Sequence, residues 1–424
     1  MDFLNSVVGT INDFLWTYII IVVLVGCGLW FTFSTGLVQL RALPEMVRLL
    51  AGDLGRRPSG RKAISSFQAF CVSTASRVGV GNIAGVAIAI VTGGPGAVFW
   101  MWVIAFIGTA TGFVESTLAQ IYKIPRGYGL FHGGPAYYIQ NALGQPTVAK
   151  LFAVLISVTF GLIYVSVQAN TIALSMEKAF GIETWVMGVV LAVLAGAVIF
   201  GGIHRVASLS AFLVPIMAGI YLLIALIIII LHMDAVPAMF ALILHDAFSP
   251  QAAVGGGIGT AVLTGIRRGL FSNEAGEGSI PNAAATANVT HPVKQGLVQA
   301  FGVYVDTWIV CSATAFIVLL TGQYTIGGDT TGIALAQDSL ASVFGPWASS
   351  LLAVLIFLFA FSSVVGNYYY GEINIHFITK NTQRALSVYR LAVVAMVFFG
   401  CVAAFGLVWN LADLFMAMIC LTNL

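Results

Sequence analysis

The chain has 424 residues, of which 59% are hydrophobic and only 8% are charged, and its formal net charge is +2. Soluble proteins carry about 25% charged residues, so the composition excludes a water-soluble enzyme, and the small net charge excludes a nucleic-acid partner. The mean hydropathy is +0.98, and the 46 glycines are typical of membrane helices that pack closely or break. We therefore predict an all-α polytopic membrane protein whose main partner is the lipid bilayer.

Eleven apolar stretches are long enough to cross a bilayer, which takes about 20 helical residues. The chain begins without the positively charged region of a cleavable signal, because Asp2 and Asp13 precede its first Arg, Arg41, so we expect the first span to be retained. The last stretch is still apolar where the sequence ends, and we expect that helix to be truncated. The predicted spans lie near residues 14–34, 66–91, 96–121, 148–176, 185–201, 208–231, 251–281, 296–321, 347–375, 386–406 and 408–424.

The basic residues are distributed unevenly between the two sides of these spans. Most Lys and Arg fall in the loop at residues 35–65 and in alternate loops after it, whereas the opposite side carries only Lys178. Because cytoplasmic loops are enriched in Lys and Arg, we expect the basic loops to be cytoplasmic and the N-terminus to lie outside. This pattern predicts a multi-pass protein of the cell membrane.

Two of the predicted spans contain stretches that should interrupt a helix. The second span contains the polar, glycine-rich stretch Ser73–Gly85, and the seventh contains Gly255–Gly259 and Gly269–Gly278. A pair of interrupted spans at corresponding places in two halves of a chain indicates a transporter binding site, where freed N–H groups bind a carboxylate and freed C=O groups bind a small cation. Glycines spaced four apart also serve helix packing, and for Gly255–Gly259 packing is an equal explanation. We expect the seventh span to break within Gly269–Gly278, because that stretch carries the polar groups.

Ionisable residues within the predicted spans are costly to bury and are therefore functional candidates. For these residues we favour mutual pairing or gating, with Arg77, Arg267 and Arg268 offsetting nearby carboxylates, over direct contact with a substrate. The candidates are Arg77, Glu115, Glu274, Glu277, Asp306 and Glu372.

Two further spans contain polar groups suited to line a site. The fourth span contains Gln168 and Asn170, and the ninth contains Ser362 and Ser363, with Asn367 one turn later. Hydroxyl oxygens and freed carbonyls are hard ligands suited to Na⁺, although a serine in a helix also bonds back to its own turn.

Enzymatic chemistry finds no support in the sequence. The six histidines lack the spacing of a zinc site, and neither a phosphate-binding loop nor a nucleophile elbow is present. The five scattered cysteines indicate buried hydrophobic residues instead of a disulfide framework. We therefore expect a protein that is not an enzyme and has no organic cofactor.

Several motifs, in order along essentially the whole chain, resemble those of the alanine or glycine:cation symporter family, also called sodium:alanine symporters. The strongest is Gly93–Trp102, with the sequence GGPGAVFWMW. The others are Ser66–Gln68, Arg77–Ala87, Gly133–Ala136, Val167–Asn170, Leu270–Gly276, Pro281–Ala285 and Phe359–Ser363.

The resemblance implies a LeuT-type fold: a five-plus-five inverted repeat of ten core helices preceded by one extra helix. Residues 1–65 would form the extra helix and a basic cytoplasmic loop. Residues 66–231 would form the first repeat, and residues 232–424 an extracellular connector and the second repeat. Core helices 1 and 6 would then be the two interrupted spans.

The resemblance also implies two ligand sites. A sodium ion would bind carbonyls of Ala75, Val78 and Phe359 and the hydroxyls of Ser362 and Ser363. The substrate carboxylate would meet N–H groups around Gly79–Asn82. The implied substrate-binding residues are Thr74, Gly79, Gly81, Asn82, Gln168, Phe271, Ser272, Asn273 and Asn367.

We therefore expect a secondary active transporter that couples Na⁺ to uptake of a small neutral amino acid, alanine or glycine, without an obligatory protein partner. Two alternatives remain open within the same fold. The coupling ion could be H⁺, carried by Glu274 or Asp306, or the preferred substrate could be glutamine.

Overall fold

A computed structural model describes residues 2–53, 63–126, 130–200, 203–249, 259–379 and 382–424 of the chain. Apart from one short hairpin, the described residues form helices joined by short connections. Helices are the expected solution in lipid, because each helix satisfies its own backbone hydrogen bonds.

The elements of the first half run from the N-terminal helix to a long helix that ends at Leu231. The N-terminal helix consists of α1 (Asp2–Leu15), the π-helical segment η1 (Trp16–Ile20) and α2 (Ile21–Ser34). After it come α3 (Val38–Arg41), α4 (Leu43–Asp53), α5 (Ser66–Arg77), η2 (Gly81–Gly85), α6 (Val86–Gly93), α7 (Gly96–Ile121), β1 (Ile124–Pro125), β2 (Phe131–His132), α8 (Pro135–Leu143), α9 (Pro146–Val158), η3 (Thr159–Tyr164), α10 (Val165–Phe180), α11 (Thr184–Ile199) and α12 (Ile203–Leu231).

The named elements of the second half, where it is described, are all helices. Its elements are α13 (Val236–Ala247), α15 (Thr260–Asn273), α16 (Ile280–Thr286), α17 (Pro292–Val303), η4 (Tyr304–Cys311), α18 (Ser312–Thr321), α19 (Gly332–Phe344), α20 (Trp347–Thr379), α21 (Gln383–Val402) and α22 (Phe405–Asn423).

Eight helices of the described residues are long and apolar enough to cross a membrane, and the bent pair formed by Ser66–Arg77 and Gly81–Gly93 makes a ninth. The predicted span at 185–201 corresponds to the shorter apolar helix Thr184–Ile199. The predicted span at 251–281 is two separate helices, α15 and α16, and its residues 251–258 lie outside the described residues. Five helices of the connections, α3, α4, α8, α13 and α19, were not among the predicted elements, because each is short and only moderately apolar.

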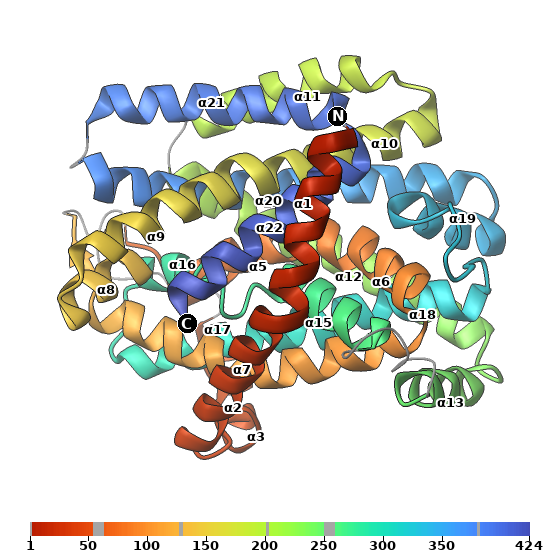
Figure 1. Cartoon of the computed structure of the whole chain (residues 1–424), viewed down its shortest axis with the longest axis horizontal. Helices are drawn as coiled ribbons and strands as arrows, with labels where there is room; N and C mark the ends of the chain where they lie inside the picture. The colour runs from red at the N-terminus through yellow and green to blue at the C-terminus, as the bar shows by residue number, and fades with distance from the viewer. Residues whose placement is uncertain (1, 54–62, 127–129, 201–202, 250–258, 380–381) are drawn as a thin grey trace.

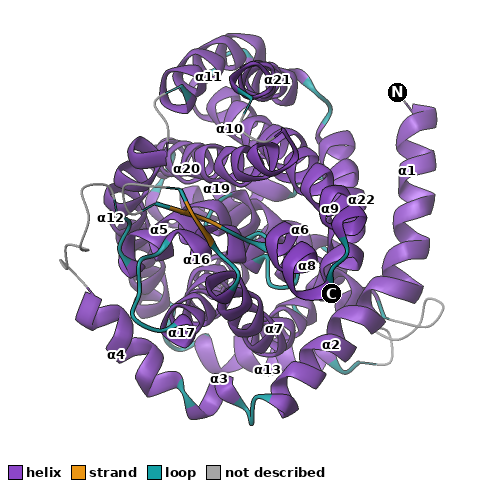
Figure 2. Ribbon diagram, turned by 90° about the vertical axis from the view of Figure 1, so that its left-hand side faces the viewer, coloured by secondary structure: helices purple, strands orange, loops and turns teal. Residues whose placement is uncertain are grey.

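The interrupted helices lie in the centre of the bundle. In Figures 1 and 2, α7 and α17 lie on one side of them, and α9, α10 and α20 lie on the other, with α11 and α21 as an outer layer. Direct contacts agree with this arrangement, because α15 packs on α7 and α6, and α20 packs on α5 and α10. The two breaks are therefore enclosed by continuous helices on both sides.

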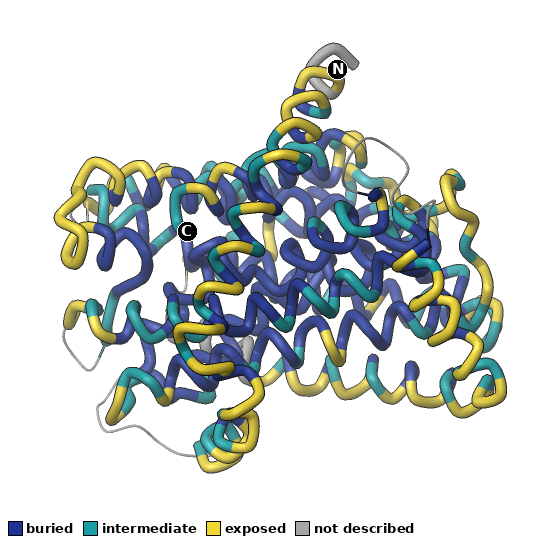
Figure 3. Tube along the Cα trace, turned by 60° about the horizontal axis from the view of Figure 1, so that its bottom comes forward, coloured by how far each residue is buried: buried dark blue, intermediate teal, exposed yellow. Residues whose placement is uncertain are grey.

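The N-terminal helix crosses the outside of this bundle obliquely (Figures 1 and 2). Exposed and buried residues alternate along it (Figure 3), with Val22 and Phe33 exposed and Trp16 and Ile20 buried. Its buried stripe packs on α22 and α7. One of its faces therefore belongs to the core, while the other is apolar and suited to lipid.

Candidate functional site

At the first helix break, hydrogen bonds to side chains replace the missing helical hydrogen bonds. Helix α5 ends at Arg77, because Val78 has an extended backbone, and the chain bends by 50° before it resumes at Gly81. The Gly79 N–H donates to Asn82 Oδ1 at 2.9 Å, and the Val80 N–H donates to Gln168 Oε1 at 3.2 Å. Two amide side chains therefore satisfy N–H groups that a continuous helix would have bonded.

The second break begins at Glu274, whose backbone is left-handed with φ of 57°. Gly276 and Gly278 also have positive φ, 104° and 75°, which glycine adopts without steric cost. The break thus lies within Gly269–Gly278, as the sequence favours, whereas residues 255–258 of the alternative stretch lie outside the described residues.

The two breaks face each other at very short range. A Cβ atom at Gly81 would lie 3.1 Å from both Phe271 Cδ1 and Ser272 Cα. The close approach of the two chains therefore leaves little room for a side chain at this position, and it places the first break directly against the end of α15.

A buried polar cluster connects both breaks to η4. The Asn82 amide donates to Asp306 Oδ1 at 2.7 Å, and the Ser272 hydroxyl donates to Asp306 Oδ2 at 2.8 Å. The hydroxyl of Thr307 accepts from the Asn273 amide at 3.3 Å and donates to Asp306 Oδ2 at 3.0 Å. Asn82 therefore satisfies a neighbouring N–H through its oxygen and a carboxylate through its nitrogen.

Three of the predicted sodium ligands, Ala75, Phe359 and Ser363, meet between α5 and α20, whereas the Ser362 hydroxyl bonds back to its own helix. The Ser363 hydroxyl donates to Ala75 O at 2.8 Å and to Phe359 O at 3.1 Å, and the Ser362 hydroxyl donates to Phe359 O at 2.8 Å. A Cβ atom at Gly79, the residue after Val78, would lie only 2.3 Å from Ser363 Oγ. Main-chain and hydroxyl oxygens of this kind are the hard donors that suit a hard cation, so the residues present fit Na⁺.

The remaining predicted residues are buried around the same breaks. Asn367 Oδ1 accepts from the Ser76 hydroxyl at 2.6 Å, and Ser76 also donates to Glu274 at 2.8 Å. Thr74 is buried, and within the described residues its hydroxyl has no hydrogen-bond partner. Asn170 is placed differently from Gln168, because its amide donates to the carbonyls of Gly400 and Ala403 on the outer layer.

An aromatic layer covers one end of the site. The ring of Phe271 lies 4.9 Å from both Tyr164 and Trp409, measured between ring centroids. The Arg268 guanidinium lies over the Trp409 ring at 4.9 Å and over the Phe271 ring at 5.8 Å. Sequence reasoning found Phe271 but missed Tyr164 and Trp409, which stand in apolar spans without a distinguishing motif.

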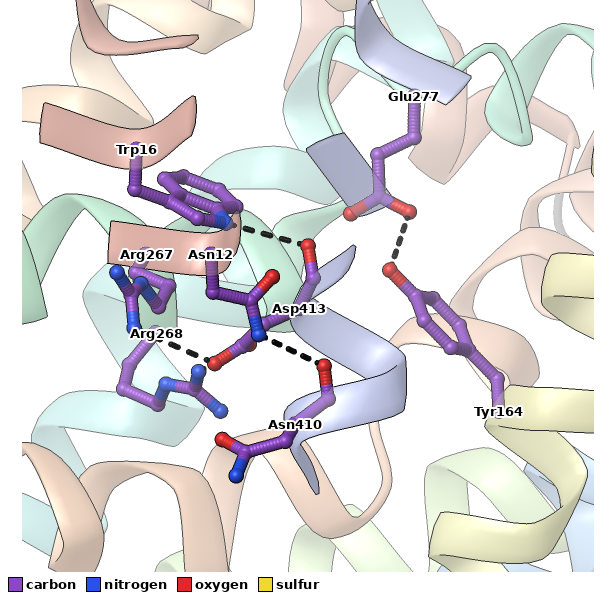
Figure 4. Close-up of polar contacts among 8 residues, drawn as sticks. All are labelled: Asn12, Trp16, Tyr164, Arg267, Arg268, Glu277, Asn410 and Asp413. Carbon is purple, nitrogen blue, oxygen red and sulfur yellow. Dashed lines mark hydrogen bonds and ion pairs between the residues drawn. The ribbon is translucent and has the colours of Figure 1, made fainter. Parts of the chain in front are cut away.

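A buried ion pair lies directly against this layer. Arg268 bonds to Asp413 Oδ1, and Arg267 lies 3.5 Å from Asp413 Oδ2 (Figure 4). The expected pairing of the two arginines is therefore confirmed, although Asp413 itself was not predicted. The hydroxyl of Tyr164, one of the rings of this layer, donates to Glu277 at 3.0 Å (Figure 4).

The expectation for Arg77 holds in part: the charges of Asp306 and Glu274 act on its guanidinium, but at longer range than an ion pair. Its guanidinium forms no ion pair within the described residues and instead donates to Ser73 O and Gln299 Oε1, both at 3.4 Å. The carboxylate of Glu274, which could have paired with it, accepts from Ser76 and Ser279 instead.

The chain resembles known membrane transporters in its sequence along its whole length. The profile of the sodium:alanine symporter family matches residues 1–424. The amino-acid carrier protein AlsT of Bacillus subtilis is 52% identical over 423 residues, which cover 100% of this chain and 89% of AlsT. The probable sodium/glutamine symporter GlnT of the same organism is 51% identical, with coverage of 99% and 87%. The sodium/alanine symporter AgcS of Methanococcus maripaludis is 37% identical, with coverage of 100% and 94%.

Among solved structures, a Na⁺-coupled sialic acid symporter in its substrate-bound outward-open state has a TM-score of 0.57. The alignment covers 95% of this chain and 83% of that chain at 17% identity. This likeness is one of fold, and it identifies the architecture as LeuT-type.

The ion pair at Asp413 generates a first prediction. Arg268→Gln should destabilise the protein by about 3 kcal/mol, the lower end of the cost of removing one partner of a buried pair, because Asp413 keeps only the more distant Arg267. Arg267→Gln should cost less, because the bond from Arg268 to Asp413 remains. Thermal unfolding in detergent would compare the two variants, and equal melting temperatures would contradict the assignment of Arg268 as the main partner.

Proposed function

The chain belongs to the sodium:alanine symporter family, and we propose that it couples inward movement of Na⁺ to uptake of alanine or glycine by alternating access. As a member of this family it is a multi-pass membrane transporter and not an enzyme. The proposal further specifies the coupling ion, the substrate and the residues that bind them.

One observation carries the proposal: the Ser363 hydroxyl bridges the Ala75 and Phe359 carbonyls beside Gly79. A Na⁺ ion bound here would replace these hydrogen bonds with ligand bonds from Ala75, Val78, Phe359, Ser362 and Ser363. Such an ion would hold α20 against the first break and fix the N–H groups that follow it. Sodium binding would therefore prepare the position at which a substrate carboxylate is bound.

The substrate would use the N–H groups at the first break. In the structure the Gly79 and Val80 N–H groups donate to side-chain amide oxygens, which stand in for the oxygens of a carboxylate. A bound amino acid would displace the Gln168 oxygen, leaving that side chain free to contact the substrate. Freed N–H groups and the positive end of a helix favour a carboxylate at this position.

The surroundings favour a small substrate side chain. Gly81 approaches Phe271 and Ser272 closely, and the aromatic layer limits the space beside them. We propose that Thr74, Asn273 and Asn367 complete the polar surroundings of the substrate.

The two ends of the site would open in turn. The ion pair of Arg268 with Asp413 and the aromatic layer close one end, which we assign to the outside on the basis of the basic cytoplasmic loops. By the same rule the N-terminus lies on the outer side of the cell membrane. The protein would need the lipid bilayer but no protein partner.

Glutamine is the second candidate substrate, because a relative named a probable sodium/glutamine symporter is 51% identical. Proton coupling through Glu274 or Asp306 is the second candidate mechanism. Uptake of labelled alanine into proteoliposomes, driven by a Na⁺ gradient, a K⁺ gradient or a proton gradient, separates these possibilities. The proposal predicts accumulation only with Na⁺ and stronger competition by glycine than by glutamine, and accumulation with a proton gradient alone would overturn it.

A second prediction tests the sodium site. Ser363→Ala should raise the Na⁺ concentration for half-maximal uptake about ten-fold, because it removes a ligand worth about one hydrogen bond to a charged group. The order of preference among amino acids should stay the same. Ser342→Ala, which removes a hydroxyl that donates to Ser339 O within its own helix, is the control. An unchanged Na⁺ activation curve for Ser363→Ala would show that the sodium site is elsewhere.

A third prediction tests the backbone site. Gly81→Leu should abolish alanine binding, because a side chain there would displace Phe271 and Ser272. Gly26→Leu, at an exposed glycine with nothing within 4 Å of its Cβ position, should bind normally. Binding measured on purified, monodisperse protein checks both variants, and normal binding by Gly81→Leu would refute a carboxylate site at the first break.

A further inference from the structure

The N-terminal helix makes two side-chain hydrogen bonds to the main chain of α22. The Asn12 amide donates to Asn410 O at 2.8 Å, and the Trp16 indole donates to Asp413 O at 3.1 Å (Figure 4). Both side chains are buried, at 2% and 0% exposure, on a helix whose other face is largely exposed. Because lipid offers these donors no alternative partner, both bonds fix the N-terminal helix to one short stretch of α22.

Asp413, whose carbonyl accepts the hydrogen bond from the indole, also forms the ion pair at the closed end of the proposed site. The Asp413 carboxylate pairs with Arg268 and Arg267, while its carbonyl accepts from Trp16. The Arg267 guanidinium lies 5.2 Å from the Trp16 ring, which adds a cation–π contact. Trp16 therefore contacts Asp413 through its N–H and Arg267 through its ring.

The N-terminal helix is anchored at a second place as well. A Cβ atom at Gly28 would lie 2.2 Å from the Ile107 side chain of α7, so α2 is seated closely on α7. Trp16 also begins the π-helical segment η1, and such segments are frequent at functional sites. The helix thus ties α22 at Asp413 to α7, which itself packs on α15.

We propose that Trp16 and Asn12 are positioning residues for the gate formed by Arg268 and Asp413. By holding the α22 main chain at Asp413, they keep the carboxylate in reach of both guanidinium groups and limit how often the gate opens. Opening separates α15 from α22, and α22 must then either release these two hydrogen bonds or carry the N-terminal helix along. The inference rests on the proposed transport function for the role of the gate, but not for the contacts themselves.

The native Cys311 offers a reporter of gate opening. Its sulfur lies 3.0 Å from the Ser272 hydroxyl and 3.4 Å from the Asn82 amide, buried against both broken helices. In a variant that retains Cys311 as its single cysteine, a small membrane-impermeant thiol reagent should react only when the gate is open. The rate of labelling in Na⁺ without alanine therefore measures opening.

Trp16→Phe removes the indole donor and keeps an aromatic ring beside Arg267. We expect Cys311 to be labelled about five times faster in this variant, the change that one lost hydrogen bond produces. The KM for alanine should rise by a similar factor, with the maximal rate within about twofold of the parent. Trp30→Phe makes the same chemical change at a position 70% exposed on the same helix, and it should leave labelling and KM unchanged.

Asn12→Leu provides an independent variant that keeps the indole intact. It should also raise the labelling rate of Cys311. If Trp16→Phe fails to give monodisperse protein, Asn12→Leu alone tests the positioning role. Labelling rates and KM values equal to those of Trp30→Phe in the variants that fold would overturn the inference. Labelling requires no alanine transport, so a parent protein that fails to accumulate alanine would refute the proposed function without affecting this test.

Discussion

Backbone groups freed within the membrane must find partners inside the protein, and this constraint organises the whole site. Lipid supplies no hydrogen bonds, so an interrupted helix survives only where other groups satisfy it. At the first break the amides of Asn82 and Gln168 do so, and at the edge of α5 the Ser363 hydroxyl does so. These side chains lie on three different elements: Asn82 on η2, Gln168 on α10 and Ser363 on α20. The breaks are therefore the points at which the continuous helices are held together.

The same partners explain how the site could respond to ligands. Amide and hydroxyl groups that satisfy the backbone can be exchanged for a carboxylate or a cation at little cost, because one set of polar contacts replaces another. In the proposed function Na⁺ takes the place of the Ser363 hydrogen bonds, and the substrate takes the place of the Gln168 bond. The aromatic layer around Phe271 and the pair of Arg268 with Asp413 then separate this exchange from one side of the membrane.

Sequence reasoning reached the parts of the structure that depend on local chemistry. The polar stretch at Ser73–Gly85 and the stretch at Gly269–Gly278 reveal both breaks, because glycine and charged residues are costly in a spanning helix. It missed Trp16, Trp409 and Asp413, since each stands in an apolar stretch and acquires its role only from a partner far away in the chain. Arg77 shows a limit of another kind: its buried charge lies near Asp306 and Glu274, but both carboxylates are already bonded to hydroxyl groups, so no direct ion pair forms within the described residues. Which charge meets which is decided by tertiary packing.

The central claim is that Na⁺ and the amino acid bind to neighbouring parts of one broken helix and therefore strengthen each other's binding. The most direct test is the equilibrium affinity of the purified protein for alanine, measured by calorimetry over a series of Na⁺ concentrations at constant ionic strength and pH. The account predicts that the Kd for alanine falls steadily as Na⁺ rises and that K⁺ has no such effect, as linkage between two sites requires. A Kd for alanine that is the same with and without Na⁺ would contradict it.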